Sequence, residues 1–133
     1  MSYLTKLKTI RTDAALTGSY VYTNGYSTSG SDQLTLLNKW TDGDCTTIEI
    51  CVQFSDTPEF TDAYSEVIFN SAGDGTETMR TRVYVLDATS PANSKINIAS
   101  EGLYFRVGAK ATGGTPTDKL QIKARVSNVE KGV

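Results

Sequence analysis

The chain has 133 residues, a length that fits one domain able to bury about two-thirds of its unfolded surface. Its 38% hydrophobic and 21% charged residues are typical of a globular protein and exclude a disordered chain. A net charge of −2 and a pI near 5.1 give no overall basic field for nucleic acid. No apolar run approaches the roughly 18 residues that span a bilayer, so we expect neither nucleic acid nor a membrane as partner.

Clusters of Gly, Ser, Asn, Asp and Pro divide the chain at short intervals, as in sandwiches and barrels. The strands expected between these turns are residues 5–12, 16–23, 33–40, 46–54, 64–70, 78–87, 95–99, 102–112 and 119–128. Several of them alternate apolar and polar residues, so each has one face to bury. We therefore predict a single all-β domain over residues 1–133: a two-layer antiparallel β-sandwich of about eight or nine strands, jelly-roll or Greek-key-like.

The N-terminal segment alternates and carries lysines, which is typical of an edge strand. Residues 1–12 are accordingly expected to form an edge strand or an arm that pairs with a neighbouring molecule by strand addition. Its candidate interface residues are Leu4, Lys6, Lys8 and Ile10. We expect no signal peptide, since the segment has no long apolar stretch and no small-residue cleavage site.

Aromatic residues gather near a Gly/Ser/Thr-rich loop in the first third of the chain. Tyr22, Tyr26 and Trp40 could form a platform on which a glycan stacks. They could equally be ordinary core and edge aromatics whose polar ends reach solvent.

Acidic residues in two loops raise the question of a calcium site. Asp42 and Asp44 flank a glycine, and Asp74 lies in an Ala-Gly-Asp-Gly-Thr stretch. Calcium favours oxygen-rich loops, but neither stretch has EF-hand spacing and Asp-Gly is foremost a turn signal. We expect turns here, and no metal or other cofactor.

The chain has no histidine, the usual general base and zinc ligand, and no motif that frames a nucleophile. The carboxylates Glu59, Asp62 and Glu66 have nothing nearby in sequence to raise a pKa. We therefore expect no enzyme. Cys45 lies in the turn before an expected strand and Cys51 lies within that strand, roughly 20 Å away, which is too far for a disulfide between them.

The last thirty residues read as a β-hairpin of residues 103–111 and 119–126, with Phe105 and Ile122 pointing inward. Pairing these strands would place two basic residues of each side by side. The resulting basic face, which could meet an acidic protein partner or simply be solvated, comprises Arg106, Lys110, Lys123 and Arg125. Upstream, Met79, Val83 and Val85 are expected to form the buried face of a strand.

Four stretches carry a resemblance to a known class. They are Ala-Leu-Thr-x-Ser-Tyr-Val at residues 15–21, Asp-Gln-Leu-Thr-Leu at 32–36, Thr-Ile-Glu-Ile-x-Val-Gln-Phe-Ser at 47–55 and Tyr-Phe-Arg-Val-x-Ala-Lys at 104–110. With them the chain resembles small accessory structural proteins in the virions of tailed bacteriophages. Residues 56–60 depart from that pattern, which commonly has Asp-Gly and Trp there. The resemblance implies a virion surface role and transfers no site residues.

The sequence thus favours a non-enzymatic virion structural protein, a capsid decoration or accessory head or tail component that binds by protein–protein contacts. Its expected partners are copies of itself, with a trimer as one option, and a capsid or tail protein. The alternative is a carbohydrate-binding β-sandwich module for receptor or glycan attachment.

Overall fold

The computed structural model describes residues 7–41, 43–71, 73–89, 92–100, 102–114 and 118–128. Leu4, Lys6 and Asp42 lie outside these ranges. The strands are β1 (Lys8–Ala15), β2 (Val21–Tyr22), β3 (Tyr26–Ser27), β4 (Gln33–Thr41), β5 (Thr47–Ser55), β6 (Tyr64–Ser65), β7 (Val67–Ser71), β8 (Glu77–Thr81), β9 (Tyr84–Asp87), β10 (Ala92–Ala99), β11 (Tyr104–Thr112) and β12 (Lys119–Ser127). Within the described part of the chain, no helix is long and apolar enough to cross a membrane.

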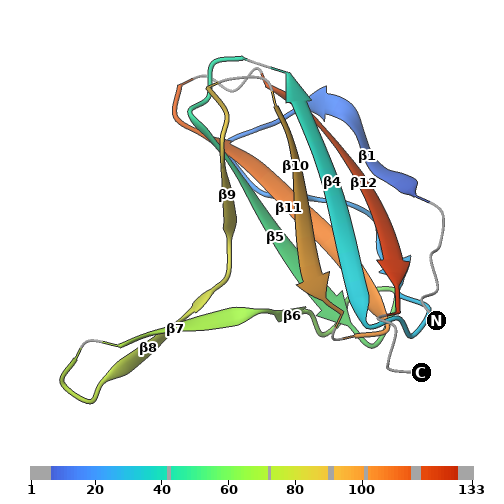
Figure 1. Cartoon of the computed structure of the whole chain (residues 1–133), viewed down its shortest axis with the longest axis vertical. Helices are drawn as coiled ribbons and strands as arrows, with labels where there is room; N and C mark the ends of the chain where they lie inside the picture. The colour runs from blue at the N-terminus through green and yellow to red at the C-terminus, as the bar shows by residue number, and fades with distance from the viewer. Residues whose placement is uncertain are drawn as a thin grey trace.

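Two antiparallel sheets make up the body of the molecule. Sheet A has the order β1-β12-β4-β10, and sheet B has the order β2-β11-β5-β6, with β3 also on β11 and β9 also on β5. Consecutive long strands change sheet: β4 lies in sheet A and β5 in sheet B, and β9 to β12 alternate between them. The two sheets lie face to face, which gives a jelly roll (Figure 1). The predicted two-layer sandwich is confirmed.

The core lies between the two sheets and follows the period of two in the long strands. Ile48 and Ile50 of β5 and Leu34 and Leu36 of β4 are fully buried. Phe105 and Ile122 are buried as well, as predicted. Burying side chains of this size contributes roughly 1.5–3 kcal/mol each, so this interior is the main source of stability.

The predicted terminal hairpin of β11 and β12 is wrong, because these strands lie in different sheets. β11 pairs with β5 along its whole length, from Tyr104 opposite Ser55 to Thr112 opposite Thr47. β12 pairs with β4 instead. Alternation reveals that a strand has one buried face but does not identify its neighbour.

The predicted strand 78–87 is divided between two places. β8 pairs with β7 outside the two packed sheets, and β9 returns to the edge of sheet B (Figure 1). The expected buried face is also wrong: Met79 is 68% exposed and Val85 is 61% exposed. On β9, Tyr84 and Leu86 pack against the core instead. The alternation is present, but which of its two faces is buried depends on where the chain leaves the sandwich.

The two edges of sheet A differ. β1 pairs with β12 through two register shifts, and the Arg11 side chain donates to the carbonyl oxygens of Ala14 and Ala15, each at 3.1 Å. Bulges and a charge at the edge oppose further strand pairing. β10, at the other edge, pairs with β4 in an unbroken register from Ala92 to Ala99.

Candidate functional site

The aromatic residues expected to form a glycan platform lie in three different environments. Trp40 is 5% exposed and belongs to the core. Tyr26 packs on the buried ring of Phe105, with ring centroids 5.9 Å apart. Tyr22 pairs with Gly108 and lies on the outer face of sheet B. The predicted platform is therefore wrong, because a buried indole cannot stack on a sugar and the two tyrosines face different sides.

The described calcium candidates do not converge either. Asp44 lies in the loop between β4 and β5, and Asp74 lies in the turn between β7 and β8, far from that loop (Figure 1). The Asp74 carboxylate accepts the backbone N–H of Thr76 at 2.9 Å, and hydrogen bonds from Thr76 lower the pKa of Asp74. Over the described residues, no group of three or more His, Cys, Asp or Glu could hold a metal ion. Asp74 thus acts as a turn residue.

The expected basic face is divided between the two outer surfaces of the sandwich. Arg106 and Lys110 lie on β11 in sheet B, whereas Lys123 and Arg125 lie on β12 in sheet A. On both strands the alternate residues are buried, so these cations point away from the core on opposite sides. The prediction that the four residues form one surface is wrong for the same reason as the terminal hairpin.

The N-terminal interface residues also separate. Lys8 is exposed, with its ammonium nitrogen 4.9 Å from the centre of the Tyr26 ring. Ile10 is only 8% exposed and is part of the core. Its side chain stabilises the sandwich and is not available at the surface.

Arg106 is held on the outer face of sheet B by three side chains. Its guanidinium lies 4.5 Å from the ring centre of Tyr22 and 4.7 Å from that of Phe60. Its Nε donates to Oε1 of Gln53 at 2.8 Å. A guanidinium placed between two rings gains cation–π attraction, which contributes about 0.5–2 kcal/mol per contact. Arg106 therefore joins β2 and the loop after β5 to the sheet.

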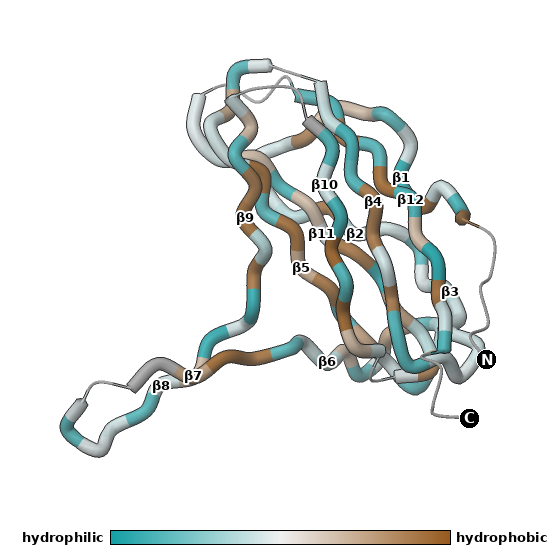
Figure 2. The backbone as a smooth tube through the Cα atoms, viewed as in Figure 1, coloured by the Kyte–Doolittle hydropathy of each residue, from teal (hydrophilic) through white to brown (hydrophobic). Residues whose placement is uncertain are grey.

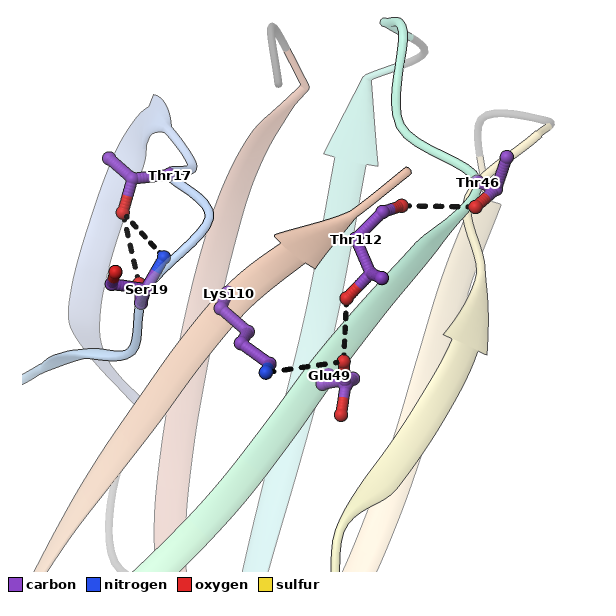
Figure 3. A network of polar contacts seen from close by, with 6 residues as sticks. All are labelled: Thr17, Ser19, Thr46, Glu49, Lys110 and Thr112. Atoms are coloured by element: carbon purple, nitrogen blue, oxygen red, sulfur yellow. Dashed lines mark hydrogen bonds and ion pairs between the residues drawn. The ribbon is translucent and has the colours of Figure 1, made fainter. Parts of the chain in front are cut away.

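Lys110 is paired inside the same face. Its Nζ lies 3.7 Å from Oε2 of Glu49 and 5.0 Å from the ring centre of Tyr20. The same carboxylate oxygen accepts the Thr112 hydroxyl at 2.6 Å (Figure 3). The Thr46 hydroxyl in turn donates to the carbonyl oxygen of Thr112 at 3.0 Å. Lys110 is thus paired with a carboxylate, whereas Arg106 is held by neutral side chains, so the two cations of β11 are each engaged within the chain.

Gly108 allows the Tyr22 ring to lie flat on sheet B. A Cβ at position 108 would stand 2.7 Å from Cε1 of Tyr22 and 3.0 Å from Sγ of Cys51. Only glycine leaves room for this approach, which is a common reason for a glycine inside a strand.

Burial on this face opposes ionisation of Cys51, Tyr20 and Tyr22, because it raises the pKa of all three side chains. Burial raises the pKa of the Cys51 thiol, and burial together with nearby Cys51 and Glu49 raises the pKa of Tyr20 to about 12. Cys45 and Cys51 are both buried and share no disulfide, so the expectation that they do not bond to each other is confirmed. A protonated buried thiol is a poor nucleophile. The cysteine and tyrosine side chains on the outer face of sheet B therefore serve for packing.

The strongest candidate for function is the β7–β8 hairpin, which we call the arm. Phe69 pairs with Met79 and Val67 pairs with Thr81, so these side chains share one face. Phe69 is 61% exposed and Val67 is 44% exposed, and Met79 is more exposed than either. The arm extends away from the two packed sheets, and Figure 2 shows a hydrophobic stretch along β7 outside the sandwich. Clustered exposed apolar residues of this kind mark interaction sites.

Contacts at the base of the arm hold its two strands together. Nε of Arg82 lies 2.8 Å from Oε1 of Glu66, and the Arg82 backbone N–H donates to the Glu66 carbonyl oxygen at 2.7 Å. The Tyr84 hydroxyl donates to Oε2 of Glu66 at 3.3 Å. These contacts join the strand that leaves the body to the strand that returns. A lone two-stranded hairpin is marginally stable in water, so the rest of the arm needs a partner surface to be fixed.

A cavity of about 430 Å³ lies where the arm leaves the body. It opens between the two sheets, because β10 of sheet A and β5 and β6 of sheet B all contribute to its wall. Its lining, more apolar than polar, consists of Phe54, Ser55, Asp56, Tyr64, Ser65, Glu66, Ala99 and Gly102. We call it the base cavity.

Sequence reasoning did not select the arm face, although one signal was available. Gly73 and Gly75 flank Asp74 and both have positive φ, 81° and 87°. Such a turn between two short alternating segments is typical of a hairpin.

No protein-family model matches the chain, and no curated protein matches it.

Proposed function

We propose that this protein is a non-enzymatic structural component that works by protein–protein contact, with the arm as its main contact element. The observation that carries the proposal is the exposed apolar face of Val67, Phe69 and Met79 on a hairpin outside the sandwich. Burying a large apolar side chain at an interface contributes roughly 1.5–3 kcal/mol, which the isolated chain does not gain there.

The sequence resemblance extends the proposal to the virion of a tailed bacteriophage. There the chain serves as a capsid decoration or as an accessory head or tail component. A jelly roll suits this role, since viral capsid domains use the same architecture. Many identical contacts on a symmetric particle add up by avidity, so each arm can bind weakly. The carbohydrate-binding alternative is not carried forward, because Trp40 is buried.

Co-sedimentation tests this function. The full chain is mixed with purified heads or tails of a phage that encodes it and separated on a density gradient. We expect it to travel with one type of particle, and the double variant Phe69→Asp with Met79→Asp to stay at the top. The matched control is Thr78→Asp, which adds a carboxylate to the opposite face of the arm and leaves binding unchanged. Absence of the wild-type chain from both particles would refute the virion role.

A further inference from the structure

We propose that the outer face of sheet A binds an extended acidic segment of another protein through a cluster of four cations. The cluster consists of Lys39 on β4, Lys95 on β10, and Lys123 and Arg125 on β12. We call it the sheet A cluster. It is a second contact surface, on different strands from the arm.

The pairing of β4 with β10 and β12 brings these cations together. Lys95 and Lys123 both lie opposite Leu37, one on each neighbouring strand. Lys39 follows Leu37 by two residues and shares its face, so it is the diagonal neighbour of both lysines, with Cα atoms about 7–8 Å apart. Arg125 follows Lys123 by two residues on β12. On β4 and β12 the residues next to these cations in sequence are buried, so the cluster faces outward.

The three strands carry no negative charge of their own, because none of β4, β10 and β12 contains an aspartate or a glutamate. Over the described residues, no ion pair or side-chain hydrogen bond joins any of the four cations to another group. The Nε of Arg125 is buried and has no hydrogen-bond partner there. Asp13 of β1 lines a small cavity together with Lys39 at the margin of the face, but no ion pair links the two within the same described part of the chain.

The cluster differs from the cations on sheet B, where Lys110 is paired with Glu49. The spacing of the sheet A cations is about one Debye length at physiological salt, roughly 8 Å, so they repel one another in the isolated chain. A lysine on an edge strand opposes unwanted pairing, which accounts for Lys95 on β10. It does not account for Lys39 and Lys123, which lie on central strands. Carboxylates from another molecule would remove the repulsion.

A groove of about 400 Å³ lies over the same face. The three lysines of the cluster line it together with Leu37, Asn93 and Gln121. Ammonium and amide groups donate hydrogen bonds to carboxylates, and the half-buried Leu37 offers an apolar contact between them. In an extended segment, side chains on one face repeat about every 7 Å. This repeat matches the spacing of the cations, so acidic residues at alternate positions fit the cluster.

The face suits a protein better than a nucleic acid. Single-stranded nucleic acid binds by stacking its bases on aromatic rings as well as by phosphate contacts. Trp40 is the one aromatic residue in the sequence of the three strands, and it is buried in the core. The net charge of −2 also weakens the long-range attraction of a polyanion.

Fluorescence anisotropy with a labelled eight-residue peptide of alternating glutamate and threonine tests the inference. We expect the wild-type chain to bind it at low salt and to release it as salt is added. Lys39→Glu places a carboxylate between Lys95 and Lys123, so it should raise the Kd by roughly 3- to 30-fold. The matched control is Arg80→Glu, which makes the same change of charge at an exposed position of the arm and should change the Kd by less than about 2-fold. Circular dichroism checks that both variants fold.

Four results would overturn the inference. The first is a wild-type chain that does not bind the peptide even at low salt. The second is an Arg80→Glu variant that loses as much affinity as Lys39→Glu, which would indicate attraction to the chain as a whole. The third is tighter binding of a single-stranded thymidine octamer than of the peptide, which would indicate nucleic acid. The fourth is loss of peptide binding in Phe69→Ala, which would place the peptide on the arm.

Discussion

The sandwich body and the arm are made of similar residues that serve opposite purposes. In the body, apolar side chains such as Ile122 and Leu36 are fully buried. In the arm, Phe69 and Met79 alternate just as regularly but face solvent. Charged groups differ in the same way: Arg106 and Lys110 are bound by aromatic rings and hydrogen-bonding side chains, whereas Arg80 on the arm is exposed. The body therefore supplies the stability of the fold, and the arm keeps its side chains available for contact with another molecule.

The largest expected difference concerns the apolar residues. Ile122→Ala should lower the free energy of unfolding by about 2–5 kcal/mol, because it leaves a cavity between the sheets. Phe69→Ala should change it by less than about 0.5 kcal/mol in the monomer, because the ring is already mostly exposed. Urea unfolding at low protein concentration measures both. Equal destabilisation would mean that the arm face is packed within the monomer.

This contrast also explains which features of the fold could be predicted from sequence. The strand positions and the inward faces of β5, β11 and β12 follow from local alternation, a property of each strand alone. Strand partners do not, because pairing is decided by tertiary packing. β11 and β12 are consecutive and equally regular, yet they lie in different sheets. The prediction that Arg106 and Lys123 lie on outward faces is correct, but the prediction that they lie side by side is wrong.

The candidate site was harder to predict than the fold. Val67, Ile68 and Phe69 form an apolar run that would suit a core strand, and only the place where the chain leaves the sandwich makes it a surface. Trp40 shows the reverse case: a large aromatic near a polar loop suggests binding, but burial in the core decides its role. In both cases the residue type is evident from the sequence, but the exposure of the side chain depends on the arrangement of the sheets.

A second comparison concerns two aspartates that accept backbone N–H groups. Asp118 is fully buried and receives the N–H of Cys45 at 2.9 Å and of Gly43 at 3.0 Å. Asp118→Asn should destabilise the body by about 1–3 kcal/mol at pH 7, since one of these N–H groups would face an amide NH₂. Asp74→Asn, in the exposed turn of the arm, should have little effect because asparagine makes the same turn. Thermal and urea unfolding report both changes.

The pH dependence sharpens this second comparison. Burial opposes ionisation of Asp118, but hydrogen bonds from Cys45 and Gly43 outweigh it and lower the pKa of Asp118 below its usual value of 3.8. A group whose pKa is lower in the folded state stabilises the fold above its unfolded pKa and loses that contribution as the pH falls through the folded pKa. The difference in the free energy of unfolding between wild type and Asp118→Asn should thus narrow below about pH 4. A constant gap down to pH 2 would contradict the role of the carboxylate charge.

The smallest expected effect separates the two arginines. Arg106→Lys keeps the charge but loses the planar contacts with Tyr22 and Phe60 and the bond to Gln53, so it should destabilise the body by roughly 0.5–2 kcal/mol. Arg80→Lys on the arm should leave monomer stability unchanged, because the Arg80 side chain is exposed on a hairpin outside the sandwich. Urea unfolding of both variants measures the difference. If Arg80→Lys lowered monomer stability as much as Arg106→Lys, the arm would be part of the folded body and the division between the two regions would fail.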